Sequence, residues 1–236
     1  MLLSEVFDHL TYGELAQINI GGSDTQGITS DHYPQVVPHI NLALTALHKR
    51  FPLRIQEIIV QQYDWIQTYI LDERYAETNK ASTEPIKYLM DSPLFPFKNN
   101  VLKIEQVFSE FGEERPINDE NSTFSVFTPT FNSILVPYND EANAFSVVYR
   151  ANHEKIVIDA GFNPTAIDLV IPDGLLEPLL YYVVSRVLSG MGGDVYQNES
   201  QLFMQRYEKA CMELEHYGLT NKQNISNHKL EIGGWV

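Results

Sequence analysis

The chain has 236 residues, 44% of them hydrophobic and 20% charged, an ordinary composition for one large or two small globular domains. Its 16 basic and 31 acidic residues give a net charge of −15. This balance argues against a sequence-independent grip on nucleic acid and against docking on anionic lipid. The single cysteine, Cys211, allows no intrachain disulfide, and its helical apolar pattern predicts a small buried hydrophobe.

The first residues predict a short helix. Ser4 is a suitable cap, the helix is expected to run to about Tyr12, and Val6, Phe7 and Leu10 share one side. Neither the basic patch of a signal peptide nor an uninterrupted run of 18 apolar residues is present, so we expect a soluble protein that folds in a cytoplasm. A further turn at 14–18 and a glycine-rich loop at 21–27 follow.

A stronger helix is predicted up to Phe51, with Ser30 or Asp31 as its cap. Pro34 suits a first turn, whereas Pro38 predicts a kink or a later start. Its apolar stripe recurs every three or four residues: Val36 or Val37, Ile40, Leu44, Leu47 and Phe51.

Between residues 53 and 171 the pattern changes to short strands separated by turn residues. The segments with β-branched, aromatic or alternating apolar residues are 54–60 and 65–71 around a turn at Asp64, 101–108 with a hairpin at Gly112 to 115–117, 124–127, 133–136, 145–150 and 166–171. This number of short strands is typical of a compact sandwich or barrel.

Helical patterns then return. The segment 175–188 is apolar nearly all round, which predicts a central buried helix with Pro178 in its first turn. After a glycine break at 190–193, a last helix is expected over about 198–217, with Gly218 as its terminator. The end of the chain is unusual, because an apolar segment with Trp235 follows about ten polar residues and resembles an anchor for a pocket on another molecule.

Together these patterns predict an α+β fold. The N- and C-terminal helices form a bundle (1–52 and 173–218), an antiparallel β sandwich or barrel module is inserted in it (53–172), and an extended C-terminal tail covers 219–236.

No pattern in the sequence indicates chemistry. Neither Gly21-Gly22 nor the glycines at 190–193 stand in a nucleotide-binding context, no histidine pair has zinc spacing, and no serine motif is present. His32 and His39 are seven residues apart, a weak signal for which a solvated or locally hydrogen-bonded role is favoured. A glycosidase carboxylate pair stays open, since its spacing exists only in three dimensions, but the paired acids at 113–114, 119–120 and 140–141 fall in expected loops. We therefore expect no enzyme, no cofactor and no metal.

Four segments of the sequence resemble those of a known protein family. They are Leu-Thr-Tyr-Gly-Glu-Leu at 10–15, the helix at 37–51, Val-Tyr-Arg-Ala-Asn-His at 148–153, and Gly-Gly-Trp-Val at 233–236. In order along the whole chain, these resemble the head-to-tail adaptor proteins of short-tailed bacteriophages, also called head-completion or connector proteins and similar to tail tubular protein A.

The resemblance implies a structural virion protein of the tail or neck, assembled in the host cytoplasm. It would form a ring, usually of twelve copies, below the portal protein, receive the tail nozzle or tube protein and fibres on its lower face, and form part of the DNA ejection channel. DNA would pass without specific binding, which an acidic wall favours. The resemblance assigns portal docking to the carboxy-terminal segment, here residues 229–236, and the expected docking residues are Leu230, Ile232, Gly233, Gly234, Trp235 and Val236.

Two other functions stay open. One is a virion-associated cell-wall hydrolase, for which no nucleophile or general acid stands out. The other is an interaction domain of a cellular complex unrelated to a capsid.

Overall fold

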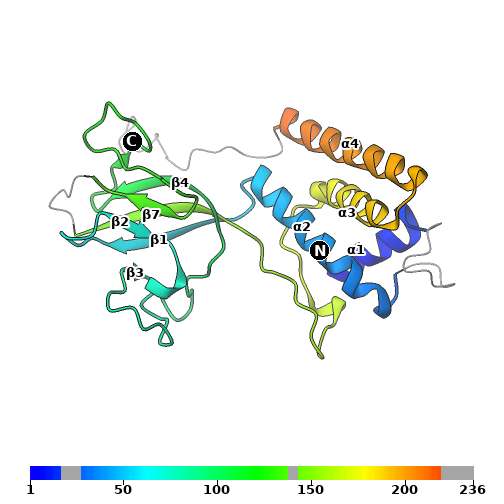
Figure 1. Ribbon diagram of the computed structural model, residues 1–236, viewed down its shortest axis with the longest axis horizontal. Helices are drawn as coiled ribbons and strands as arrows, with labels where there is room; N and C mark the ends of the chain where they lie inside the picture. The colour runs from blue at the N-terminus through cyan, green and yellow to red at the C-terminus, as the bar shows by residue number, and fades with distance from the viewer. Residues whose placement is uncertain (17–27, 138–142, 219–236) are drawn as a thin grey trace, which may run out of the picture. The chain divides into compact units, whose positions relative to one another are not determined.

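A computed structural model describes residues 1–16, 28–137 and 143–218 of the chain. The chain forms two compact units: Met1–Ala43 with Val157–Val236, called here the helical unit, and Leu44–Ile156, called here the β unit. The fold is α+β, with N-terminal helices, central antiparallel sheets and a C-terminal helix pair, as the sequence predicts (Figure 1). The predicted domain limits stay a prediction, and the predicted tail lies outside the described residues.

The helical unit begins with α1 (Leu3–His9), which continues as a π-helical turn, Leu10–Glu14. The apolar side predicted for it is buried, with Val6, Phe7 and Leu10 at most 4% exposed. The predicted cap at Ser4 is wrong, because the N-cap is Leu2, two residues earlier, and Ser4 lies inside the helix. The Glu5 carboxylate instead accepts a hydrogen bond from the backbone N–H of Leu2, at 2.8 Å.

The second helix, α2 (Tyr33–Arg50), follows a 3-10 turn at Ser30–His32. The helix begins before Pro38 and continues past it, so the later start is wrong, and the kink stays a prediction. The whole predicted stripe is buried: Val36, Val37, Ile40, Leu44, Leu47 and Phe51. Within the helical unit, Tyr33 stacks on Phe7, with ring centroids 4.7 Å apart, which holds the start of α2 on α1.

Helices α3 (Leu176–Met191) and α4 (Asp194–His216) lie side by side as a hairpin (Figure 1). Gly192 and Gly193 join them at φ values of +73° and +85°, a region that side chains with a Cβ rarely adopt. As predicted, α3 buries Leu179, Val183 and Leu188, and Cys211 of α4 is fully buried. The fourth helix begins four residues earlier than expected.

The segment 166–171, predicted as the last strand, forms no regular strand and belongs to the helical unit. It pairs with the start of the chain through a single bridge between Leu2 and Asp168. Two backbone hydrogen bonds flank this bridge, from Leu3 N–H to the Ile167 carbonyl and from Leu169 N–H to the Met1 carbonyl. The apolar alternation of 166–171 therefore reflects packing beside α1.

The β unit contains a five-stranded antiparallel sheet and a two-stranded one. The large sheet has the order β3-β1-β7-β4-β5, with the bounds Leu89–Met90, Ile55–Gln61, Ala144–Ala151, Val101–Ser109 and Glu114–Arg115. The small sheet pairs β2 (Thr68–Ile70) with β6 (Ser133–Leu135). The turn at Asp64 therefore joins strands of different sheets, and the predicted strand 124–127 is reduced to isolated bridges at Val126 and Phe127.

One core lies between the two sheets. Tyr69 of β2 contacts the rings of Phe145 on β7 and of Tyr88 edge to face, with centroids 5.3 and 5.2 Å apart. The Tyr69 hydroxyl accepts a hydrogen bond from Tyr63 N–H at 2.8 Å, which satisfies it inside the core. The predicted strand at 145–150 supplies alternate residues to this core. The predicted strand at 101–108 supplies Val101, Ile104 and Val107, which are three residues apart because the register of β4 shifts twice.

Candidate interaction surface

The portal-docking residues predicted from the sequence lie outside the described residues. They are Leu230, Ile232, Gly233, Gly234, Trp235 and Val236. The described part of the chain does not test them, so that assignment stays a prediction.

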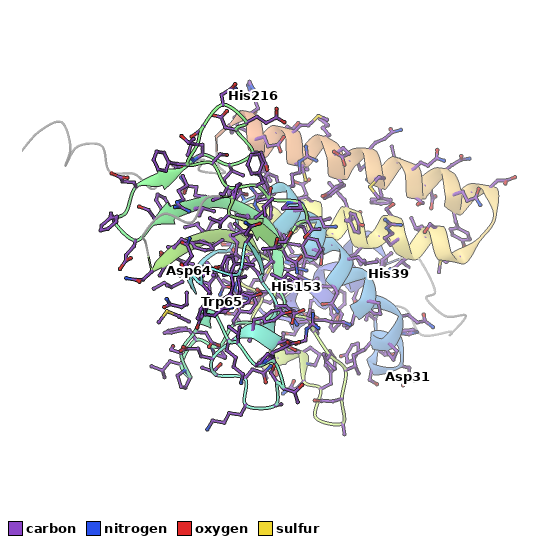
Figure 2. The ribbon with its side chains drawn as sticks, turned by 60° about the vertical axis from the view of Figure 1, so that its left-hand side comes forward. Asp31, His39, Asp64, Trp65, His153 and His216 are labelled. Carbon is purple, nitrogen blue, oxygen red and sulfur yellow. The ribbon has the colours of Figure 1, made fainter. Side chains whose placement is uncertain are left out.

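Large apolar side chains stand exposed on several loops of the β unit. Figure 2 shows Trp65 beside Asp64 on the loop after β1, and Trp65 is 71% exposed. Leu94 and Phe95, between β3 and β4, are 85% and 82% exposed. The other members of this set are Phe111, Phe124 and Phe131. Side chains of this kind gain little in water, and aromatic residues at a surface are enriched where proteins meet.

One pocket lies along β1. It has a volume of about 360 Å³, and its lining combines residues 54–58 of β1 and its approach with residues 94–98 of the loop before β4. Glu154 at its rim lies 2.6 Å from Lys98 Nζ and 3.7 Å from Arg54 Nη2. The hydrogen bond from Lys98 and its charge hold the pKa of the Glu154 carboxyl below its usual range.

Inside this pocket, Gln56 Oε1 accepts two hydrogen bonds, each of 3.2 Å, from the Tyr149 hydroxyl and from Asn100 Nδ2. Burial raises the pKa of Tyr149 to about 12, so its hydroxyl keeps the proton that it donates. These contacts fix the pocket wall, and they leave the charged groups at the rim and the apolar side chains of Leu94 and Phe95 facing outward.

The second pocket lies along β4 and has a volume of about 480 Å³. Residues 102–105 of β4 form one side, and Ile117, Asn118 and residues 128–131 form the other. Asn118 has a left-handed backbone (φ 57°), and its side chain bonds to both the N–H and the hydroxyl of Thr128, each at 2.9 Å. This pair of hydrogen bonds fixes the far wall, beside which Phe131 is 65% exposed.

His32 and His39, seven residues apart in the sequence, lie before and within α2. His32 takes the local role favoured from the sequence, since its Nδ1 lies 3.0 Å from both the N–H and the hydroxyl of Thr29. Figure 2 shows Asp31, in the 3-10 turn before α2, and His39 within α2. Burial lowers the pKa of His39, and the nearby Arg186 lowers it further.

One histidine pair was not apparent from the sequence. The rings of His48 and His153 lie 5.7 Å apart in the β unit, although 105 residues separate them along the chain. His48 Nδ1 donates to the Leu44 carbonyl at 2.8 Å, and His153 Nδ1 donates to the Glu154 carbonyl at 2.8 Å. The pair joins the last turns of α2 to the segment after β7, and only the long-range pairing of strands brings it together.

Across residues 1–16, 28–137 and 143–218, no group of three or more His, Cys, Asp or Glu side chains is placed to hold a metal ion. None of the helices in these ranges combines the length and apolarity that a membrane span requires. The acidic pair Asp119-Glu120 occupies a turn, where the Asp119 carboxylate accepts from Asn121 N–H at 3.0 Å.

No model of a known protein family matches the chain, and no curated protein is found to be similar to it.

Proposed function

We propose that this chain is a structural virion protein, the subunit of a ring-forming head-to-tail adaptor that connects the portal protein to the tail nozzle or tube. The observation that carries the proposal is the set of exposed apolar side chains on separate loops of the β unit, Trp65, Leu94, Phe95, Phe111, Phe124 and Phe131. Aromatic side chains are enriched where proteins meet, and a ring subunit contacts two neighbours and further proteins.

The charge and the fold support the same function. The net charge of −15 makes a wall of many copies strongly acidic, so that DNA is repelled and slides past it. The α+β layout, a helical unit with a β unit inserted between α2 and α3, agrees with what the sequence resemblance implies.

The test is deletion of residues 229–236. We expect a folded protein that no longer joins portal-containing particles, because the apolar residues of the tail, Trp235 above all, supply the anchor. Replacing Trp235 by alanine is expected to cost about 2 kcal/mol per site, multiplied in effect by the number of copies in the ring. Normal attachment of the truncated protein would disprove the anchor.

The hydrolase alternative has a separate test. We expect the purified protein to leave a peptidoglycan suspension turbid. Clearing of the suspension, lost on heating the protein, would replace the structural function by a lytic one.

A further inference from the structure

Both edge strands of the five-stranded sheet are only two residues long, so most of β1 and of β4 has no strand partner on its outer side. On one side the short β3 pairs only with Ile59 and Val60 of β1. On the other side the short β5 pairs only with Val107 and Phe108 of β4. Residues 55–58, called here the β1 edge, and residues 102–106, called here the β4 edge, have strand neighbours on one side only.

The direction of the backbone groups on the β1 edge follows from one hydrogen bond. Gln61 N–H donates to the Tyr88 carbonyl, so Gln61 directs its polar groups away from β7. Alternate residues of an antiparallel strand do the same, which places the N–H and C=O groups of Ile55 and Glu57 on the bare side. Within the described part of the chain nothing pairs with them there, so they are available to an extended segment of another chain.

The β4 edge differs from the β1 edge in its regularity. The register against β7 shifts between Val101 and Lys103 and again between Ile104 and Gln106. Such bulges, with an exposed lysine, are features that prevent indiscriminate pairing of an edge. A contact at this side therefore depends on the neighbouring pocket and its side chains more than on a ladder of hydrogen bonds.

Each edge combines a pocket with protruding apolar side chains. Leu94 and Phe95 stand beside the β1 edge and its pocket of about 360 Å³. Phe131 stands beside the β4 edge and its pocket of about 480 Å³. An aromatic side chain of one edge can therefore fill the pocket of the other, the arrangement found at the energetic centres of protein interfaces.

The charges at both edges are balanced. Arg54 and Lys98 stand with Glu57 and Glu154 at the first pocket, and Lys103 with Glu105 at the second. Copies that each carry −15 repel one another, and this repulsion is weakest where the facing surfaces are locally neutral. Balanced charge thus favours a second copy of this chain as the occupant.

We propose that neighbouring copies meet through these edges, the β1 edge of one copy against the β4 edge of the next, with Phe95 seated in the β4 pocket. The two edges lie on opposite sides of the sheet, toward the β3 and β4 labels in Figure 1. The contact is therefore head-to-tail, the type that closes into a ring. This inference rests on the proposed adaptor ring, and it assigns the surfaces from which that ring is built.

The first experiment compares charged variants of the full chain. Phe95→Glu and Phe131→Glu are each expected to weaken ring formation at least tenfold, measured by sedimentation and by electron microscopy of the protein alone and with portal-containing particles. Val170→Glu is the matched control, because Val170 is equally exposed, at 84%, but belongs to the helical unit and lines neither pocket. Circular dichroism of all three verifies the fold.

The second experiment tests whether the contact between neighbouring copies is head-to-tail. In a Cys211→Ala background, one chain carries both Leu94→Cys and Phe131→Cys and is treated with a short bifunctional maleimide. This double variant should form covalent oligomers well beyond the dimer. A mixture of the two single-cysteine variants should stop at the dimer, and each variant alone should give none. Dimers from one single-cysteine variant alone would indicate a two-fold contact and overturn the proposal.

The remaining outcomes separate this inference from the proposed function. If the wild-type protein forms rings and the Phe95→Glu and Phe131→Glu variants form them equally well, the edge contact is rejected, but the proposed adaptor function is not. Rings lost only on deletion of residues 229–236 would assign the contact to the tail. A wild-type protein that forms no ring, alone or on portal particles, would contradict both proposals.

Discussion

His48 and His153 face each other with ring centroids 5.7 Å apart, and both of their Nδ1 atoms donate to backbone carbonyls. His153 Nε2 lies 3.3 Å from the Thr45 hydroxyl, which also accepts a hydrogen bond from Asn152 at 3.2 Å. With Nδ1 protonated on each ring, both histidines satisfy these contacts in their neutral forms. Protonation of both would place two positive charges side by side near Arg54.

This pair predicts a stability that falls in mild acid. Burial, with further contributions from His153 and Arg54, lowers the pKa of His48, so the unfolded chain takes up a proton before the folded chain does. The melting temperature is expected to decrease as the pH falls below about 6.5, the ordinary histidine pKa. His48→Gln should flatten part of this slope, and His9→Gln, at an exposed position, should leave it intact. Equal slopes in all three proteins would contradict the prediction.

Arg150 should matter for stability far more than the surface cations. Its Nη2 lies 2.6 Å from Glu105 Oε1 and its Nη1 donates to the Lys49 carbonyl at 2.7 Å, with the arginine side chain 16% exposed. Arg150→Met is expected to cost about 1–3 kcal/mol, because partly buried acceptors lose their donor. Urea unfolding followed by circular dichroism measures this cost. Lys98→Met, which removes a largely exposed ion pair, should stay within about 1 kcal/mol.

Two glycines at the end of α3, one inside the helix and one just after it, give predictions of opposite sign. Gly192 has a φ of +73°, so Gly192→Ala is expected to destabilise the protein by about 1 kcal/mol. Gly190 lies inside α3 with open space around it, and Gly190→Ala should stabilise by about 0.5–1 kcal/mol. Thermal unfolding of the two variants side by side checks the ordering, and a reversed order would show that the turn is formed differently.

Two phenylalanines of the β unit should respond very differently to truncation. Phe145 is 1% exposed and packs against Tyr69, so Phe145→Ala is expected to cost about 3–5 kcal/mol. Phe111, 82% exposed on the β4–β5 turn, should change the free energy of unfolding by less than about 0.5 kcal/mol on the same substitution. Chemical denaturation curves measure both. Similar losses at the two positions would mean that Phe111 is also buried, within an assembly.

Cys211 should resist thiol reagents in the folded protein. Its side chain is fully buried on α4, consistent with the interpretation as a packing residue. A colorimetric thiol assay is expected to detect no fast reaction in buffer and one thiol per chain in denaturant. Rapid labelling of the native protein would show that α4 opens readily.

Local patterns in the sequence predicted most of the elements, and the errors have identifiable causes. The alternation at 101–108 and 145–150 gave correct strands, because each has one face on the core. The alternation at 166–171 was misleading, since packing beside α1 produces the same pattern. Ser4 is not the cap because the helix starts at Leu3, and the Glu5 carboxylate accepts the hydrogen bond from Leu2 N–H at the N-cap position, two residues before Ser4.

The candidate surface could be predicted only in part. The anchor at Trp235 comes from the sequence alone. The two pockets depend on which strands lie at the sides of the sheet, and no local pattern encodes the order β3-β1-β7-β4-β5. The His48–His153 pair is hidden for the same reason, since its partners meet only after distant segments have paired.

The register of β1 against β7 has a consequence for how the protein is made. Ile55 pairs with Arg150, so the central ladder of the β unit cannot form until the ribosome has synthesised almost two thirds of the chain. The helical unit is completed later, because α1 and the π-helical turn after it pack against α3, which is synthesised after the β unit. The inserted unit is therefore expected to fold first during translation, and the earliest helices of the chain to acquire their native packing last.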